Sequence, residues 1–380
     1  MLQNPELHYL DNAATTMVAP EVADVIDKAM REHWANPSSL YGPGARSEEA
    51  LNAARAAVAR TLGCKPKELY FTSCGSESNN LALLGAVRTR TFGKGIVVSG
   101  FEHPSVQRPL EELAKQGYNV TVVKPRPDGT LNINEMLEHV DKNTILVACM
   151  MVNNEVGTRN DVERLAAEVK RRNSRTIVHV DAVQAWMRVP IKLDNIDTLS
   201  VSGHKIHAPK GIGALYIGPR VRNPRPLLPG GGQEMGLRSG TEATAQIAGF
   251  AKAVELRWDH LEDKLHHMAE VKAYAVEKLT AIPDLQIIGS GKAPHVLSVS
   301  MAGWPSQNVV NDLGSQGICV SAGSACHHGK SSQVVSALGL PKRVAAGVIR
   351  LSFGPETTFA EIDACAEALR NHHDHRMPML

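Results

Sequence analysis

One lysine stands in a local context that favours chemistry. Lys205 follows a strand-like run, residues 198–201, that is broken by Gly203, and a second such run begins at residue 213 after further turn residues. We therefore place Lys205 on a tight loop at the end of a strand. A lysine that is partly desolvated there has its pKa, ordinarily about 10.4, lowered enough to act as an amine nucleophile that forms a Schiff base. Because a His-Lys pair between turn residues is also typical of a solvated loop, other residues must decide.

An aspartate closes the buried strand that precedes the lysine loop. Residues 176–180, Thr-Ile-Val-His-Val, are strand-like, Asp181 follows them directly, and Gln184 comes three residues later. An aspartate in this position usually caps the next element or pairs with a cation. Asp181 lies 24 residues before Lys205, one strand earlier in the alternation of strands and helices. Adjacent strand ends would then hold both side chains around one space.

A turn of small residues lies between a strand and a helix in residues 68–84. Gly75 and Ser76 occupy this turn. Such a turn directs free backbone N–H groups and the positive end of a helix at whatever lies in front of it, which suits a phosphate. Serine-rich helix caps are also common where no phosphate binds.

Polar residues follow two other strands, and one arginine lies inside an apolar segment. His103 comes just past a strand at residues 95–99, and Asn154 just past the apolar run 144–152, where open parallel sheets keep their ligands. For His103, a helix cap or a surface position is an equal alternative. Arg350 needs an acidic partner, which is either a substrate carboxylate or a carboxylate of the protein itself.

One cysteine has surroundings that favour reactivity. Cys326 lies in residues 321–330 among small residues, with His327, His328 and Lys330 close by. Flexibility and local positive charge favour a reactive thiolate. The alternatives are a small buried cysteine and a Cys/His metal site. We disfavour a metal because a second Cys/His cluster at ligand spacing is missing from the sequence.

Composition excludes several classes of function. The 380 residues can form two domains, and 43% hydrophobic and 21% charged residues are ordinary for a globular chain. A net charge of +2 argues against binding to nucleic acid or to an anionic membrane surface. The polar N-terminus and the shortness of all apolar runs predict a cytoplasmic protein without a membrane span. The six cysteines lack a C-x-x-C pair, so we expect no disulfides and mostly buried thiols, as for Cys149.

Taken in order, these motifs resemble those of the cysteine desulfurases, a family in the aminotransferase class V group of fold-type I pyridoxal-phosphate enzymes. Residues 202–205, Ser-Gly-His-Lys, resemble the family's cofactor-binding lysine motif. Residues 323–326, Gly-Ser-Ala-Cys, resemble its catalytic cysteine loop. The likeness extends from residues 9–16 to residues 350–352, which is nearly the whole chain.

The resemblance implies an α/β architecture of the fold-type I class. It has a large domain with a mainly parallel seven-stranded sheet and a small α+β C-terminal domain. We expect the large, cofactor-binding domain at residues 16–257, and the small domain, with the catalytic cysteine loop, at residues 1–15 and 258–380. Within the large domain, Asn160 is expected to cap a helix at residues 161–172.

The resemblance also implies roles for individual residues. Lys205 would bind pyridoxal 5'-phosphate and take the substrate's α-proton, Asp181 would keep the pyridine nitrogen protonated, and Cys326 would attack the substrate sulfur. His103 would stack on the ring and move protons, while Asn154 and Arg350 would bind the substrate. Thr241 would reach the cofactor of the partner subunit. The expected cofactor contacts are Gly75, Ser76, His103, Asn154, Asp181, Gln184, Ser202, His204, Lys205 and Thr241, and no metal site is expected.

The implied activity is the conversion of L-cysteine to L-alanine by a homodimer, with sulfur transferred to a persulfide on Cys326. A sulfur-acceptor or scaffold protein would then take the sulfur for iron–sulfur clusters or thiolated products. A selenocysteine lyase and a transaminase are the alternatives within the enzyme class. From a different class, the chain could be a noncatalytic scaffold for sulfur-carrier assembly. The presence of Lys205, Asp181 and Cys326 together argues against that scaffold.

Overall fold

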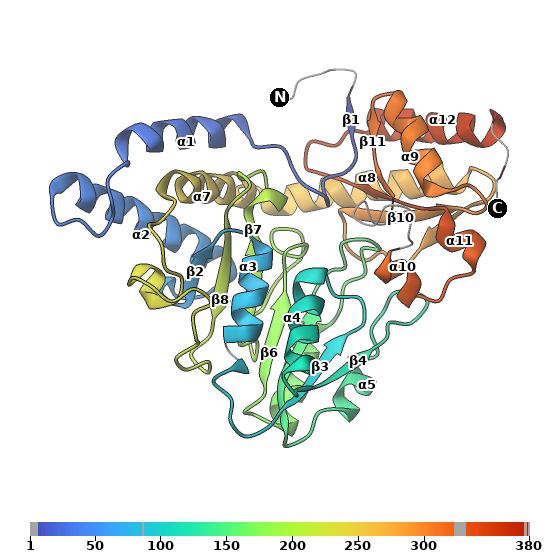
Figure 1. Ribbon diagram of the computed structural model, residues 1–380. Coiled ribbons are helices and arrows are strands. Elements are labelled where there is room, and N and C mark those ends of the chain that lie inside the picture. The colour runs from blue at the N-terminus through green and yellow to red at the C-terminus, as the bar shows by residue number, and fades with distance from the viewer. Residues whose placement is uncertain (1–6, 86, 323–331, 376–377, 379–380) are drawn as a thin grey trace.

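The computed structural model describes residues 7–85, 87–322, 332–375 and 378. Its largest sheet has seven strands in the order β2-β8-β7-β6-β5-β3-β4 (Figure 1). Neighbouring strands are parallel from β7 to β4, whereas β8 runs antiparallel to both β7 and β2. The predicted seven-stranded, mainly parallel sheet is therefore confirmed. The strands are β2 (Leu69–Thr72), β3 (Gly95–Ser99), β4 (Asn119–Val123), β5 (Thr144–Met150), β6 (Ile177–Asp181), β7 (Thr198–Ser202) and β8 (Gly213–Ile217).

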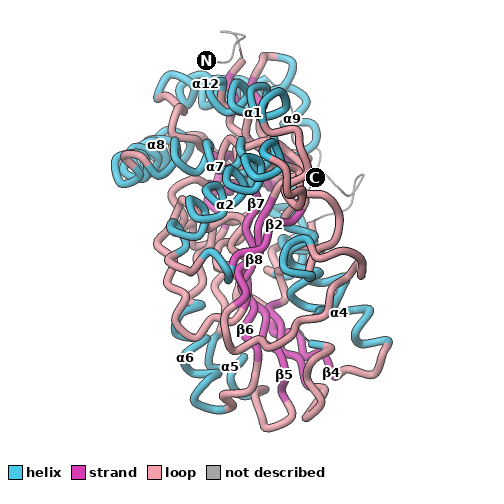
Figure 2. Tube along the Cα trace, turned by 90° about the vertical axis from the view of Figure 1, so that its left-hand side faces the viewer, coloured by secondary structure: helices cyan, strands magenta, loops and turns pink. Residues whose placement is uncertain are grey.

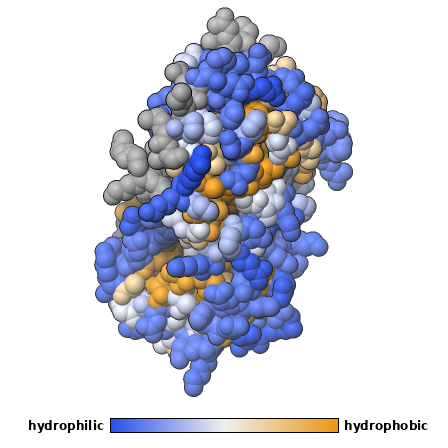
Figure 3. Space-filling model, turned by 90° about the vertical axis from the view of Figure 1, so that its right-hand side faces the viewer, coloured by the Kyte–Doolittle hydropathy of each residue, from blue (hydrophilic) through white to orange (hydrophobic). Residues whose placement is uncertain are grey.

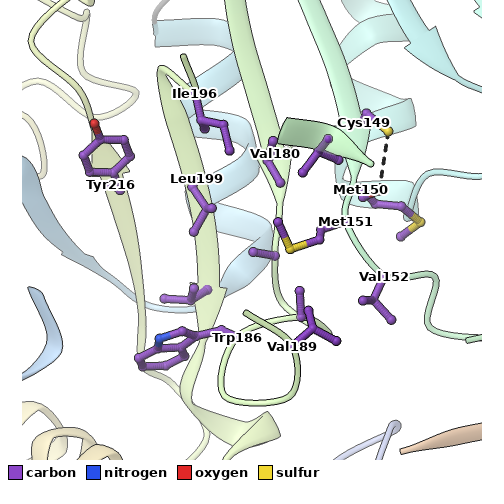
Figure 4. Close-up of a cluster of buried hydrophobic side chains, with 14 of the residues drawn as sticks. Cys149, Met150, Met151, Val152, Val180, Trp186, Val189, Ile196, Leu199 and Tyr216 are labelled. Carbon is purple, nitrogen blue, oxygen red and sulfur yellow. Dashed lines mark hydrogen bonds between the residues drawn. The ribbon is translucent and has the colours of Figure 1, made fainter. Parts of the chain in front are cut away.

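The central strands are buried along their whole length because helices cover both faces of the sheet. Helix α4 lies on one face, and α5 and α6 lie on the other (Figure 2). Figure 4 shows side chains of β5, β6 and β7 packed together in the core, including Val180 and Leu199. Cys149 is also buried there, as predicted for a small hydrophobic residue. These helices are α3 (Gly75–Asn80), α4 (Pro104–Lys115), α5 (Ile133–Glu138) and α6 (Val162–Arg172), with short helical turns η1 (Pro66–Glu68), η2 (Leu81–Gly85), η3 (Gly203–Lys205) and η4 (Gln233–Gly236).

Three longer helices pack together beside this sheet: α1 (Pro20–Glu32), α2 (Gly42–Leu62) and α7 (Thr244–Trp258) (Figure 1). Helix α2 buries an apolar stripe that includes Leu51, Val58 and Leu62. It ends at Gly63, whose φ of 70° lies in the left-handed region that glycine adopts without a steric penalty.

The C-terminal part forms a second, antiparallel sheet in the order β12-β13-β10-β9. The buried side chains of this part, many of them leucines, form a separate hydrophobic core that also contains Trp304 and Phe353. The N-terminal strand β1 pairs with β11, and Asp11 bridges to Ser352, so the start of the chain contacts this part. The elements are β1 (His8–Tyr9), α8 (Leu261–Thr280), β9 (Leu285–Ile288), β10 (Val296–Met301), α9 (Ser306–Ser315), β11 (Ile318–Cys319), β12 (Ser321–Ala322), α10 (Gln333–Ala337), α11 (Lys342–Ala346), β13 (Val348–Ser352) and α12 (Phe359–His375).

One local prediction was wrong. Helix α6 is capped by Asp161, whose carboxylate accepts from the Arg164 N–H, and not by Asn160. Asn160 is buried, and its amide donates to the Met150 carbonyl at 2.8 Å. Asn160 provides the hydrogen bond that the buried Met150 carbonyl at the end of β5 requires. Asp161 therefore caps the helix, and aspartate is as good a capping residue as asparagine.

The face that Figure 3 shows is mainly hydrophilic, with hydrophobic residues exposed in patches. Among the residues that the structure describes, no helix is long and apolar enough to cross a membrane.

Candidate active site

A cavity of about 410 Å³ lies at the carboxyl ends of β5, β6 and β7, between the chain segment at residues 13–14 and strand β13. Ten of the predicted site residues line it. They are Gly75, Ser76, His103, Asn154, Asp181, Gln184, Ser202, His204, Lys205 and Arg350. Thr241 is exposed and lies outside this lining set. Cys326 lies outside the described residues.

Lys205 ends the η3 turn that follows β7, as the break in the strand pattern predicted. Its Nζ donates to the carbonyls of Ala13 at 2.8 Å and Ala14 at 2.7 Å. Burial lowers the pKa of Lys205 to about 7, and the nearby Arg188 and Arg350 charges add to this effect. A substantial fraction of the Lys205 amine is therefore neutral, and hence nucleophilic, near neutral pH.

Asp181 ends β6, and its Cα pairs with Ser200 on β7, so the expected adjacency of the two strand ends is present. The side chain is only 5% exposed. Its Oδ1 accepts from the Val183 N–H at 2.9 Å, and its Oδ2 accepts from the Asn79 amide at 2.8 Å. These bonds fix the carboxylate in the wall of the cavity that Lys205 also lines.

A buried arginine that the sequence analysis missed supports the lysine turn. Arg188 donates to the Lys205 carbonyl at 2.6 Å and to Gln184 Oε1 at 2.8 Å. Gln184 Nε2 in turn donates to the Ala13 carbonyl at 2.8 Å. The segment at residues 13–14, whose carbonyls accept from Lys205 Nζ, is thus hydrogen-bonded through Gln184 to the end of β6. The sequence feature that could have identified Arg188 is its position between two apolar residues shortly after Asp181.

His103 is the N-cap of α4, which is the alternative that the sequence left open, and it also lines the cavity. Its Nδ1 accepts from the Ser105 N–H at 3.1 Å and lies 2.7 Å from Ser105 Oγ. Burial in the cavity wall lowers the pKa of His103. His204 is held by Thr15, with 3.1 Å between Nδ1 and Oγ1, and burial lowers its pKa to about 3.

Arg350 has a protein carboxylate as a partner. Its Nη2 donates to Asp11 Oδ1 at 2.7 Å and its Nη1 to the Asn154 carbonyl at 2.7 Å. Its Nε is buried and has no hydrogen-bond partner among the described residues. The two bonds use only two of the five N–H donors of the guanidinium, so the structure keeps both alternatives for Arg350.

The turn at the start of α3 provides the small residues expected for an anionic group. Gly75 is buried, and a Cβ added to it would meet the Val183 side chain at 2.7 Å. The Ser202 hydroxyl is buried at the cavity and lacks a hydrogen-bond partner within the described parts of the chain. A buried hydroxyl of this kind is a donor for a bound ligand. Within the same parts, no cluster of three or more His, Cys, Asp or Glu side chains could hold a metal ion.

Two buried carboxyl groups beside the cavity were also missed. Burial raises the pKa of Glu102 to about 8 and that of Glu155 to about 7. Glu102 Oε1 accepts from the Met150 N–H at 2.7 Å, and Glu155 accepts from the Ser332 hydroxyl. Both could have been identified from the sequence, because Glu102 is next to His103 and Glu155 is next to Asn154, and these neighbours are predicted site residues at strand ends.

Comparison with known proteins places this geometry in a family. The aminotransferase class-V family matches residues 8–365. A cysteine desulfurase of Trichormus azollae is 40% identical over 368 residues, which are 95% of this chain and 91% of that protein. A solved structure described as a NifS-like protein has a TM-score of 0.91 at 35% identity and covers 97% of this chain and 99% of its own. The structure of SspA in complex with cysteine has a TM-score of 0.80 at 31% identity and covers 92% and 99%.

The matches span almost the full length of the chain and of the proteins matched. They agree with the order of motifs and with the seven-stranded sheet. The chain therefore belongs to the aminotransferase class V family and, within it, to the cysteine desulfurases, which use pyridoxal phosphate.

Proposed function

We propose that this chain is a pyridoxal-phosphate-dependent cysteine desulfurase that converts L-cysteine to L-alanine. The observation that carries the proposal is the convergence of Lys205, Asp181 and Arg350 on one cavity of about 410 Å³. A nucleophilic amine, a fixed carboxylate and a carboxylate-binding cation are the three groups that amino-acid chemistry on this cofactor requires.

The residues of the cavity fit pyridoxal phosphate. Gly75, Ser76 and the Ser202 hydroxyl, which has no partner in the described structure, would hold the phosphate. Asp181 would pair with the pyridine nitrogen. Gln184 uses one amide hydrogen for the Ala13 carbonyl, and its second hydrogen would bind the ring's 3-oxygen.

When bound, the cofactor supplies an aldehyde that condenses with amines and a protonated ring that accepts the electrons released at the substrate's α-carbon. Lys205 provides the amine that holds the cofactor and then the base that takes the α-proton, and its lowered pKa suits both tasks. His103 and His204 line the same cavity, and His103 would move a second proton.

Arg350 and Asn154 would bind the substrate. Arg350 would donate to the α-carboxylate with the N–H groups that remain after Nη2 has bonded to Asp11 and Nη1 to Asn154. The SspA structure that contains cysteine supports L-cysteine as the substrate, since it shares the fold at 31% identity.

Cys326 would act as the sulfur acceptor. Its thiolate attacks the sulfur of the bound cysteine, the new S–S bond forms as the substrate's C–S bond breaks, and the carbon retains the electron pair and takes a proton. The products are a persulfide on Cys326 and alanine. A sulfur-acceptor or scaffold protein would then receive the sulfur for iron–sulfur clusters or thiolated products.

The proposal includes a homodimer, a domain division near residue 257 and a cytoplasmic location. The exposed Thr241 would reach the cofactor phosphate of the second subunit. Light scattering tests the dimer, and Thr241→Ala should weaken cofactor retention without changing the mass of the assembly. Cell fractionation tests the location.

The test is the absorption spectrum of the purified protein with and without L-cysteine, followed by an alanine assay. We expect a cofactor band that responds to L-cysteine, together with one alanine per sulfur released. Strict dependence on selenocysteine would favour the lyase, and a keto-acid product would favour the transaminase. A protein that fails to bind the cofactor would contradict the proposal.

A further inference from the structure

A buried asparagine joins two of the groups to which the proposed function assigns chemistry. Asn79 lies on α3 and is 1% exposed. Its Nδ2 donates to Asp181 Oδ2 at 2.8 Å and to Ser105 Oγ at 2.8 Å. Ser105 Oγ lies 2.7 Å from His103 Nδ1. One amide nitrogen therefore connects the carboxylate of Asp181 to the imidazole of His103 through a single hydroxyl.

A second buried histidine contacts the oxygen of the same amide. His179 lies on β6 two residues before Asp181, so both side chains point to the same face of the strand. Its Nε2 lies 3.1 Å from Asn79 Oδ1, and its Nδ1 lies 2.9 Å from Thr198 Oγ1. His179 is completely buried, and burial lowers its pKa to about 3, so the ring is neutral and carries a single N–H.

The positions of the hydrogens follow from these contacts. The amide nitrogen of Asn79 faces Asp181 Oδ2, which already lies on a carboxyl group rich in acceptors, and the amide oxygen faces His179. The oxygen only accepts, so the hydrogen of His179 is on Nε2. Its Nδ1 then accepts from the Thr198 hydroxyl.

The same reasoning continues to His103. The Ser105 N–H points at Nδ1 of His103, so this nitrogen accepts in the neutral ring. The Ser105 hydroxyl accepts from Asn79 and donates to the same Nδ1. The hydrogen of neutral His103 is thereby assigned to Nε2. The bonds from Thr198 through His179, Asn79 and Ser105 to His103 run in one direction, and His103 Nδ1 is shared by the N–H and the hydroxyl of Ser105.

We propose that Asn79 is a positioning residue that holds Asp181 and His103 in one fixed geometry, with His179 fixing the orientation of its amide. The inference rests on the proposed function, since it concerns groups of the same site. A flipped amide would place an oxygen against the Asp181 carboxylate and would require the other tautomer of His179. The orientation of the amide and the tautomer of His179 are therefore coupled, and Ser105 links His103 to this pair.

The first test needs neither cofactor nor turnover. In cofactor-free protein labelled with 15N-histidine, we expect long-range proton–nitrogen spectra to show His179 and neutral His103 with the hydrogen on Nε2. Asn79→Ala should remove the single tautomer of His179. Ser105→Ala should change His103 and leave His179 unchanged. A native His179 with its hydrogen on Nδ1 would overturn the inference.

The second test uses the holoprotein and a matched control. Asn173 is also buried, and its amide donates to the Asp141 and Thr144 carbonyls at the opposite, amino-terminal edge of the sheet. Both Asn79→Ala and Asn173→Ala should lower the unfolding temperature. Only Asn79→Ala should speed cofactor loss and lower kcat per cofactor-loaded site by about 10²-fold, because Asp181 and His103 lose their common support.

Equal kcat per loaded site in the two variants would give Asn79 a purely structural role and overturn the inference. If the native protein releases no alanine from L-cysteine, the proposed function fails, and the nitrogen spectra still decide the arrangement of the amide and the two histidines.

Discussion

Asp11 and Arg350 form an ion pair in which Oδ1 and Nη2 are 2.7 Å apart, although 339 residues separate them in sequence. Both side chains are largely buried. The arginine that we expect to bind the substrate carboxylate thus already neutralises a carboxylate of the protein. The substrate must share this guanidinium with Asp11.

Asp11→Asn should strengthen substrate binding. The amide oxygen can still accept from Nη2, but it no longer neutralises the guanidinium, so the substrate carboxylate meets a stronger positive field. We expect KM for L-cysteine to fall by about tenfold, which corresponds to about 1.4 kcal/mol. Steady-state kinetics of the native enzyme and of Arg350→Gln provide the comparison. A rise in KM as large as that in Arg350→Gln would mean that Asp11 orients the arginine instead of competing for it.

Cofactor capture should depend on pH through Lys205. The pKa of this lysine is lowered to about 7 by burial, and the neutral amine is the nucleophile. The rate at which cofactor-free protein binds added pyridoxal phosphate should therefore rise with pH through a midpoint near pH 7 and level off at higher pH. Arg350→Gln removes a nearby positive charge and should move the midpoint to higher pH.

Stopped-flow absorbance measures this rate, and Lys205→Ala is the control that should show no covalent capture. A midpoint near the ordinary pKa of lysine would show that burial does not activate the amine.

Glu102 should make stability depend on pH. Burial raises its pKa from 4.5 in the unfolded chain to about 8 in the folded protein. Between these values the folded state holds a proton that the unfolded state has lost, so the free energy of unfolding falls as pH rises from about 4.5 to 8. Glu102→Gln keeps an acceptor for the Met150 N–H and cannot ionise. Its unfolding temperature should exceed that of the native protein by an amount that grows from pH 5 to pH 8.

Thermal unfolding at both pH values measures the difference. The exposed Glu111→Gln on α4 is the control, and its difference from the native protein should stay constant. A difference for Glu102→Gln that is also constant would show that Glu102 ionises normally in the folded protein.

The residue pattern was sufficient to predict the strand ends at which Lys205 and Asp181 leave the sheet, whereas the seven-stranded sheet itself was predicted from the family resemblance. Apolar runs and turn residues mark strand ends directly, and parallel strands bring their carboxyl ends to one edge. The contacts that support these residues could not be predicted in this way. Arg188 reaches back to the Lys205 carbonyl, and Asn79 reaches Asp181 across 102 residues, so both depend on tertiary packing.

The same limit explains one alternative that stayed open and one prediction that was wrong. His103 is both a helix cap and a cavity residue, because the first turn of α4 opens on the cavity. The prediction of Asn160 as the cap of α6 was wrong because a buried carbonyl requires that side chain, which leaves Asp161 as the cap. The role of Cys326 stays a prediction, since that residue lies outside the described structure.

The transfer of sulfur from L-cysteine to Cys326 is the central claim, and one measurement tests it most directly. Native protein and Cys326→Ala are incubated with L-cysteine, alanine is quantified, and persulfide is trapped by alkylation and located by mass spectrometry. We expect alanine and a trapped persulfide at Cys326 in the native protein. In Cys326→Ala we expect background alanine and no persulfide, with a cofactor spectrum that still responds to L-cysteine. Full alanine formation in Cys326→Ala would contradict the account.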